Sequence, residues 1–187
     1  MTNTGGYIAN RAEVYARHAV PGGTPASKWP DPVGSERWYS WSMFLPAQFA
    51  VSDQWMSLMQ WKGYRGGSPP LGFEANRGRL ELTSNPFSMR QNVGTVSGVQ
   101  NTWTRWVVGV RWSTATDGWV EVWRGLPGGP LQQVLPRRQM QTMEIINGQP
   151  DPVYLKQGLY RSGGWTAAHV VYYGPTLIGR TKQSVLG

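Results

Sequence analysis

The sequence predicts an all-β domain, built as a sandwich or barrel of antiparallel strands. Its 24 glycines and 14 prolines punctuate the chain throughout. Between them lie short segments in which Trp, Val, Tyr and Leu alternate with polar residues, and helical periodicity is hard to find. Such runs, bounded by turn residues, are typical of sandwiches and barrels. No internal repeat or separating linker is visible, so residues 1–187 are expected to form one domain.

The alternation gives the expected strands directly. In chain order they are 10–17, 37–45, 55–62, 71–76, 79–83, 104–113, 118–124, 153–161 and 168–173. Two tripeptides, Asn76-Arg77-Gly78 and Thr116-Asp117-Gly118, read as tight turns between consecutive strands. The expected loops are 18–35, 63–70, 85–101 and 126–152.

The composition restricts the classes of function. The net charge of +8 comes mainly from 14 arginines and implies an acidic partner: a uronic or sulfated glycan, nucleic acid, or an acidic protein surface. Nucleic acid is the least favoured partner, because the charges do not cluster and no nucleic-acid-binding motif is present. No apolar stretch is long enough to span a membrane. The N-terminus lacks a signal peptide, so we expect a cytoplasmic protein, or a virion or extracellular protein after release.

Cofactor chemistry has few candidate ligands in this chain. The absence of cysteine excludes disulfides, thiolate catalysis and Cys-based zinc sites. With only two histidines, His18 and His169, a multi-His metal site is disfavoured as well. The ten acidic residues are scattered, so no Ca²⁺ site is readable, although a structural Ca²⁺ ion stays open. We therefore expect no cofactor.

Three short segments carry a family resemblance. They are Arg11-Ala12-Glu13-Val14, Gln60-Trp61-Lys62 and the seven residues from Tyr154 to Tyr160, Tyr-Leu-Lys-Gln-Gly-Leu-Tyr. In this order they resemble the Arg-x-Glu-Leu, Gln-x-His and Tyr-x-Lys-x-Gly-x-Tyr strands of the alginate-lyase and heparin-lyase-I-like jelly rolls. The resemblance covers residues 9–180. It implies an antiparallel β-sandwich of concanavalin-like, jelly-roll type, with an acidic polysaccharide bound in a concave cleft.

The resemblance also implies catalytic roles, for cleavage of uronate glycans by β-elimination. Arg11 and Gln60 would hold the substrate carboxylate, Tyr160 would transfer protons, and Lys156 would assist Tyr160 or bind an anionic subsite. The family's histidine is Lys62 here. An ordinary lysine, with a pKa of about 10.4, neutralises a carboxylate but is a poor base at neutral pH. Either Tyr160 serves as both base and acid, or the site binds glycans without cleaving them.

Further side chains are candidate substrate contacts because strand alternation or loop position sets them on the expected polar face. They are Tyr154, Glu13, Arg17, Arg105, Arg111, Trp165 and His169. Each motif also has a plainer interpretation. Arg11 and Glu13 could form a cross-strand ion pair, and Tyr160 could be a half-buried strand aromatic.

A second functional class is a non-catalytic, lectin-like virion protein, such as a phage tail or capsid-decoration protein. It would bind host-surface glycans or stabilise the particle. The missing signal peptide, Lys62 and the short segment before Arg11 favour it. A jelly roll lacking an edge strand exposes unpaired backbone, so we expect a homo-oligomer or virion partner proteins to complete the N-terminal edge. A purely structural role, with the cleft as a relic, is a further alternative.

Overall fold

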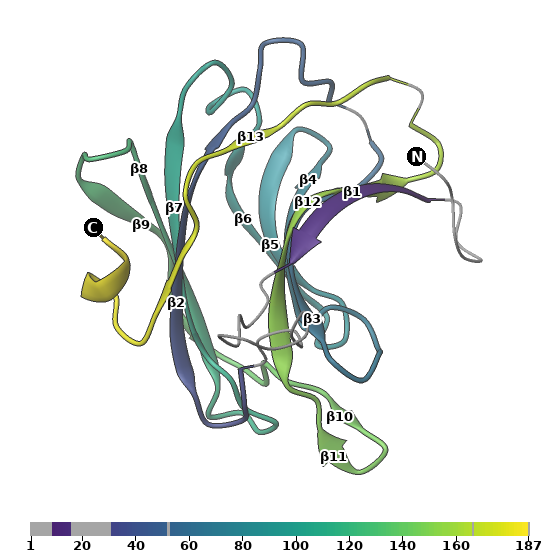
Figure 1. Ribbon diagram of the computed structural model, residues 1–187, viewed down its shortest axis with the longest axis vertical. Coiled ribbons are helices and arrows are strands. Elements are labelled where there is room, and N and C mark those ends of the chain that lie inside the picture. The colour runs from purple at the N-terminus through teal and green to yellow at the C-terminus, as the bar shows by residue number, and fades with distance from the viewer. Residues whose placement is uncertain (1–8, 16–30, 52, 166, 187) are drawn as a thin grey trace, which may run out of the picture.

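A computed structural model describes residues 9–15, 31–51, 53–165 and 167–186, and it contains two antiparallel sheets packed face to face (Figure 1). The first sheet, in spatial order, consists of β1 (Ala9–Tyr15), β12 (Val153–Ser162), β3 (Met56–Gly63), β4 (Leu71–Asn76), β5 (Arg79–Ser84) and β6 (Met89–Thr95). The second consists of β13 (Tyr172–Tyr173), β2 (Glu36–Phe44), β7 (Thr104–Arg111), β8 (Trp119–Gly125) and β9 (Leu131–Gln139), with β14 (Leu177–Gly179) also paired to β2. The predicted antiparallel β-sandwich is confirmed.

Two small elements complete the described chain. The hairpin of β10 (Ile145–Ile146) and β11 (Gln149–Pro150) precedes β12, and the 3-10 helix η1 (Gln183–Val185) follows β14. No helix among the described residues is long and apolar enough to cross a membrane.

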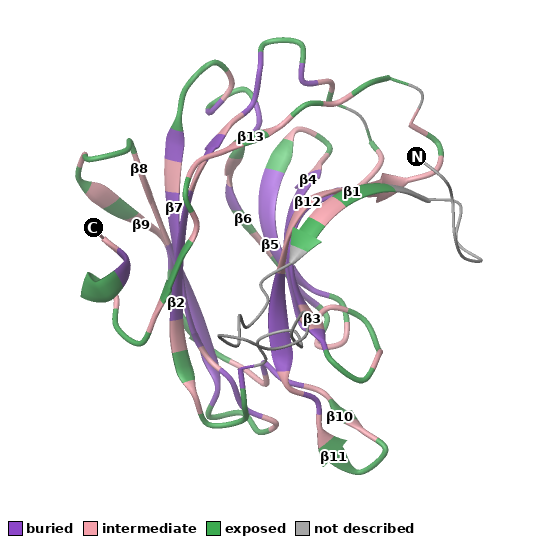
Figure 2. Cartoon of the chain, viewed as in Figure 1, coloured by how far each residue is buried: buried purple, intermediate pink, exposed green. Residues whose placement is uncertain are grey.

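The core lies between the two sheets, and buried residues are concentrated in the central strands of both (Figure 2). Its centre is aromatic. Trp41 meets Trp61 and Phe73 edge to face, with ring centroids 6.2 and 5.4 Å apart, and Phe73 meets Trp106 at 4.8 Å. Aromatic rings pack favourably in this tilted arrangement. Among the described tryptophans, those buried in this way are structural: Trp38, Trp41, Trp61, Trp106, Trp112 and Trp119.

Two strands were expected as loops. β6 lies in the segment 85–101 and β9 in the segment 126–152. Both are at the edge of their sheets and bury few side chains. Edge strands need no apolar alternation, and β9 even carries Pro136, which an edge strand tolerates. Conversely, the expected strand 168–173 is much shorter in the structure and consists only of Tyr172–Tyr173. The expected Asn76-Arg77-Gly78 turn is present, with φ of 49° at Arg77 and 76° at Gly78.

Register shifts decide which side chains of β3 and β12 face outward. The register of β3 shifts between Ser57 and Met59, so Met56 and Leu58 are buried in the core while Gln60 faces the opposite side. Strict alternation along a strand would put all three on one face. A second shift, in β12, contains Gly158, whose φ is +133°. A Cβ at Gly158 would lie 2.2 Å from the Ala12 carbonyl oxygen, so this position requires glycine.

Candidate functional site

A cleft of about 800 Å³ lies on the face of the first sheet that points away from the core. Its lining includes all five residues predicted as catalytic: Arg11, Gln60, Lys62, Lys156 and Tyr160. They come from three adjacent strands, β1, β12 and β3, although more than 140 residues separate the first from the last. Antiparallel pairing of a late strand with an early one brings them together.

Strand register aligns the cleft residues in two rows. In one row Lys156 is paired with Gln60, Gln60 with Gly72, Gly72 with Thr83, and Thr83 with Arg90. Residues that lie directly opposite in neighbouring strands share a face and are about 5 Å apart. This row therefore crosses the sheet from β12 to β6.

The second row begins at the edge strand β1. Arg11 is paired with Tyr160, Tyr160 with Ser57, Ser57 with Glu74, and Glu74 with Glu81. The Arg11 guanidinium lies 4.5 Å from the centre of the Tyr160 ring, a cation–π distance. The Tyr160 ring also packs edge to face against the Trp55 ring, with ring centroids 5.1 Å apart. The phenol is thus positioned by a cation and an indole.

Lys156 is held in the cleft by Glu13 of the neighbouring strand. The two form an ion pair in which only 4% of the Glu13 side chain is exposed. Glu13 does not line the cleft, and its ionic partner is Lys156 rather than Arg11. This corrects both expectations for Glu13: it anchors a cleft residue instead of contacting substrate or pairing with Arg11.

Lys62 is engaged by a loop at one end of the cleft. Its Nζ donates hydrogen bonds to the carbonyl oxygens of Gly66, at 3.0 Å, and Gly67. Glu144 also lies at this loop, where a Cβ on Gly67 would meet its carboxylate. Burial raises the pKa of Glu144 above its ordinary value, while the Lys62 charge acts to lower it. An ammonium that donates to two carbonyls is suited to hold the loop, not to accept a proton.

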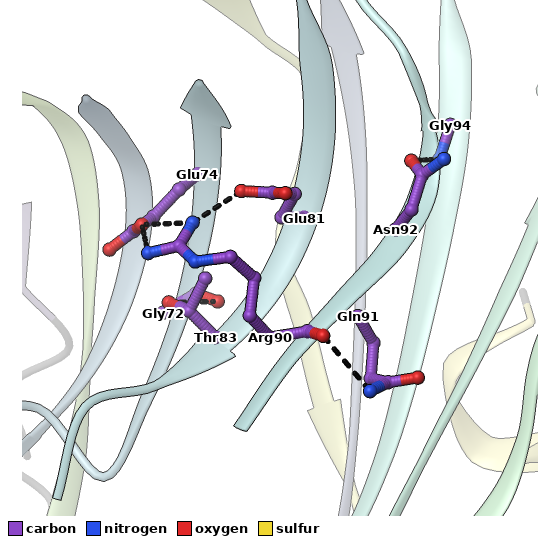
Figure 3. Close-up of polar contacts among 8 residues, drawn as sticks. All are labelled: Gly72, Glu74, Glu81, Thr83, Arg90, Gln91, Asn92 and Gly94. Atoms are coloured by element: carbon purple, nitrogen blue, oxygen red, sulfur yellow. Dashed lines mark hydrogen bonds and ion pairs between the residues drawn. The ribbon is translucent and has the colours of Figure 1, made fainter. Parts of the chain in front are cut away.

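The other half of the cleft contains a cluster that the sequence did not reveal (Figure 3). Arg90 of β6 contacts Glu74 of β4, with Nη1 3.4 Å from Oε2, and also forms an ion pair with Glu81 of β5. Both glutamates are buried, and burial raises the pKa of Glu74 although the Arg90 charge opposes this. Alternation with Gly72 and Thr83 could have indicated the glutamates. Arg90 was hidden because its segment read as a loop.

The family model described as "Polysaccharide lyase" matches residues 2–175. The chain belongs to this polysaccharide lyase family. A sequence search of curated proteins gave no match.

Solved structures show that this lyase-family chain shares its fold with carbohydrate-active enzymes. An endo-β-1,4-glucuronan lyase from the fungus Trichoderma reesei matches with a TM-score of 0.70 and 18% identity, over 97% of this chain and 79% of that chain. An alginate lyase from Pseudomonas aeruginosa matches with a TM-score of 0.59 and 14% identity, over 91% and 74%. A GH131 β-glucanase catalytic domain from Podospora anserina matches with a TM-score of 0.62 and 14% identity, over 98% and 70%. The jelly-roll fold expected from the resemblance is thereby confirmed.

Two predicted substrate contacts of this polysaccharide-lyase chain lie on the other sheet. Arg105 of β7 donates to the carbonyl oxygens of Val185 and Leu186 at 2.7 and 2.6 Å, and to Ser40 Oγ at 3.1 Å. Arg111, at the end of β7, is within 3.7 Å of Glu36 and 3.5 Å of Asp117. Both side chains do alternate with the core residues of their strand, as expected, but this strand, β7, belongs to the second sheet. Neither residue can line the cleft.

Three more candidates lie away from the cleft. Tyr154 is buried, and Trp165 packs partly buried against the core. His169 contacts the Trp165 ring at 4.4 Å and the Arg161 guanidinium at 2.6 Å. Burial lowers the pKa of His169, and the Arg161 charge lowers it further. None of the three lines the cleft. Loop position and alternation did not specify which surface of the molecule these side chains would join.

The remaining candidates fall outside the described chain. Arg17 and His18 belong to the segment 16–30, which the structure does not describe. Within the described ranges, no histidine lines the cleft and no group of three or more His, Asp or Glu side chains could hold a metal ion. The catalytic and binding roles of the cleft residues stay predictions.

Proposed function

We propose that the protein is a lyase that cleaves an acidic polysaccharide by β-elimination in the cleft of the first sheet. One observation carries the proposal: Arg11, Gln60, Lys156 and Tyr160 line the same cleft in a chain of the polysaccharide lyase family. These residue types match the needs of the reaction. The glucuronan and alginate lyases of the same fold act on uronate polymers, which fits the basic lining.

The substrate carboxylate would lie against Arg11 and Gln60, with Lys156 next to Gln60 in the same row. Removal of the C5 proton places negative charge on this carboxylate. Guanidinium, amide and ammonium groups aimed at that charge stabilise it more strongly as it develops, which lowers the barrier. Glu13 keeps Lys156 in position but does not line the cleft.

Tyr160 would transfer the proton. In its ionised form, the phenolate oxygen takes the proton from C5. The C4–O4 bond then breaks as the C4=C5 double bond forms, and Tyr160 returns the proton to O4 of the leaving chain. This role falls to Tyr160 because Lys62 donates to loop carbonyls, and because no histidine of the described ranges lines the cleft.

An assay with glucuronan and alginate tests the proposal. We expect unsaturated products, detected by the ultraviolet absorbance of the new double bond. Tyr160→Phe removes only the hydroxyl, so its kcat should fall at least about 100-fold, the usual contribution of a proton-transfer group. Tyr172→Phe is the matched control, because Tyr172 is an exposed tyrosine of the second sheet. Full activity of Tyr160→Phe would contradict the assigned role.

A non-catalytic glycan-binding protein is the second candidate, favoured by the engagement of Lys62 at the family's histidine position. Calorimetric binding of a uronate polymer without any product, reduced by Arg11→Ala, would establish it. Absence of both binding and cleavage would reject both candidates and leave a structural role. Virion location and completion of the N-terminal edge by a partner stay predictions.

A further inference from the structure

We propose that the cleft selects a glycan in which a uronate is followed by an uncharged, hydroxyl-rich sugar. The uronate would occupy the half formed by β1, β12 and β3, and the neutral sugar the half formed by β4, β5 and β6. This inference rests on the proposed function and adds the identity of the neighbouring sugar.

The two halves of the cleft differ in charge. The first half carries the cations Arg11, Lys62 and Lys156 with one carboxylate, Glu13, behind them, a formal sum of three minus one, or +2. Asp53, from the loop before β3, also lines this half and lowers its sum to three minus two, or +1. The second half carries Arg90 and Arg77, the latter from the β4–β5 turn, against Glu74 and against Glu81, which does not line the cleft; its formal sum is two minus two, or zero.

Arg90 is already committed to carboxylates of the protein. Both glutamate side chains are nearly buried, 11% and 6% exposed, whereas the Arg90 side chain is 43% exposed. A substrate carboxylate placed here would approach the fixed carboxylate of Glu74, beside a guanidinium that is already paired with two glutamates. Like charges in a partly buried site repel strongly, because little water screens them. This half therefore disfavours a uronate.

Hydroxyl groups suit the same lining. A hydroxyl donates to a carboxylate oxygen and accepts from a guanidinium or amide N–H. Glu74 and Arg90 offer the first two partners, and the Asn76 and Asn85 side chains in the lining offer amides. A neutral sugar presents many such hydroxyls and no charge.

The spacing places this half beside the uronate clamp. Gln60 of β3 is paired with Gly72 of the adjacent strand β4, and the Glu74 carboxylate leans over Gly72, where an added Cβ would lie 3.3 Å from Glu74 Oε1. Adjacent strands are about 4.8 Å apart, and Arg90 on β6 is two strands beyond β4, about 10 Å. The Glu74 carboxylate is thus within reach of the sugar next to the one held by Arg11 and Gln60.

A matched pair of polymers tests the inference. Glucuronan is compared with glucuronan in which part of the carboxylates has been reduced to hydroxymethyl groups, so that many uronates have neutral neighbours. We expect the wild-type kcat/KM, normalised to uronate content, to be about tenfold higher on the partly reduced polymer, the effect of removing one like-charge contact. In Glu74→Gln/Glu81→Gln, the half becomes cationic through Arg90, so the preference should shift toward fully charged glucuronan.

Glu121→Gln is the control variant. Glu121 is also a buried strand glutamate paired with an arginine, Arg137 at 3.3 Å, but it belongs to the second sheet. Its substrate preference should equal that of the wild type. Thermal unfolding of each variant checks folding, and Glu74→Gln alone replaces the double variant if that does not fold.

The outcomes separate the two proposals. Cleavage of both polymers with equal efficiency, a wild-type preference for glucuronan, or an unchanged preference in the glutamate variant would overturn this inference and leave the lyase proposal standing. Cleavage of alginate alone would also overturn this inference and leave the lyase proposal standing, whereas failure to cleave alginate and both glucuronan polymers would overturn both.

Discussion

The outward faces of the two sheets carry similar residues but use them differently. On the first sheet, Arg11 and Lys156 line a cleft that is open to a ligand. On the second, the outward-facing Arg105 donates to Val185 and Leu186 at the end of the chain. There the segment from β14 to η1 covers a small apolar cluster that contains Trp38, Val107, Trp119 and Val185. A basic residue opposite the core is therefore a binding candidate only where the fold leaves its donors exposed.

The largest effect is expected from detaching the edge of the cleft sheet. Gly158→Ala should lower the free energy of unfolding by more than about 3 kcal/mol, because the strained φ costs about 1–3 kcal/mol and the new Cβ would collide with the Ala12 carbonyl. It should also abolish glycan binding, since β1 carries Arg11. Chemical denaturation and calorimetry measure the two effects.

Gly128→Ala is the matched substitution in the turn between β8 and β9 of the second sheet. Gly128 also has a positive φ, +74°, but no atom lies within 4 Å of a Cβ added there. The cost should be about 1 kcal/mol, with binding unchanged. Equal destabilisation by the two substitutions would show that the contact with Ala12 is not what Gly158 provides.

The next effect compares two arginines directly. Arg11→Ala should reduce kcat/KM about 100-fold, as expected for loss of one donor to the developing charge, and should change stability by about 1 kcal/mol or less. Arg105→Ala should reverse this pattern. It should lower the free energy of unfolding by about 1.5–3 kcal/mol, since charge-assisted bonds to two carbonyls are lost, and leave kcat/KM unchanged. Steady-state kinetics and urea denaturation distinguish the two, and a loss of activity in Arg105→Ala would break the comparison.

The smallest effect concerns His169, in the segment that links β12 to β13. Because burial lowers its pKa below 6.5, the unfolded chain binds a proton more readily than the folded chain. The stability contribution is complete above about pH 6.5 and is lost as the pH falls toward the lower, folded-state pKa. Urea denaturation from about pH 5 to 8 should show this slope, and His169→Asn should flatten it. An unchanged slope would assign it to another group.

Much of the fold could be predicted because core strands obey local rules. In 104–113, Trp106, Val108 and Val110 occupy every second position, and all three are buried in the main core, whereas Val107 between them belongs to the small apolar cluster on the other face. The Arg77-Gly78 turn was predictable as well, because glycine readily adopts the positive φ that such a turn requires. Edge strands such as β6 and β9 were missed because each pairs with only one neighbouring strand and is largely exposed to solvent. Their sequences therefore show little alternation of apolar and polar residues.

The cleft was predictable only in part. The resemblance grouped Arg11, Gln60, Lys156 and Tyr160, whereas alternation alone could not say that Arg105 belongs to the other sheet. The Glu74–Arg90–Glu81 cluster depends on a register between three strands, one of which was not recognised. Contacts that depend on which strands pair, and in which register, cannot be predicted from the local alternation of apolar and polar residues.

The hydrogen bonds of Lys62 have a consequence for how this sequence could change over time. Replacing Lys62 by histidine, as in the related motif, would leave the carbonyls of Gly66 and Gly67 without their cationic donor and Glu144 without its neighbouring charge. We therefore expect relatives that carry histidine at this position to differ in residues 63–67 as well.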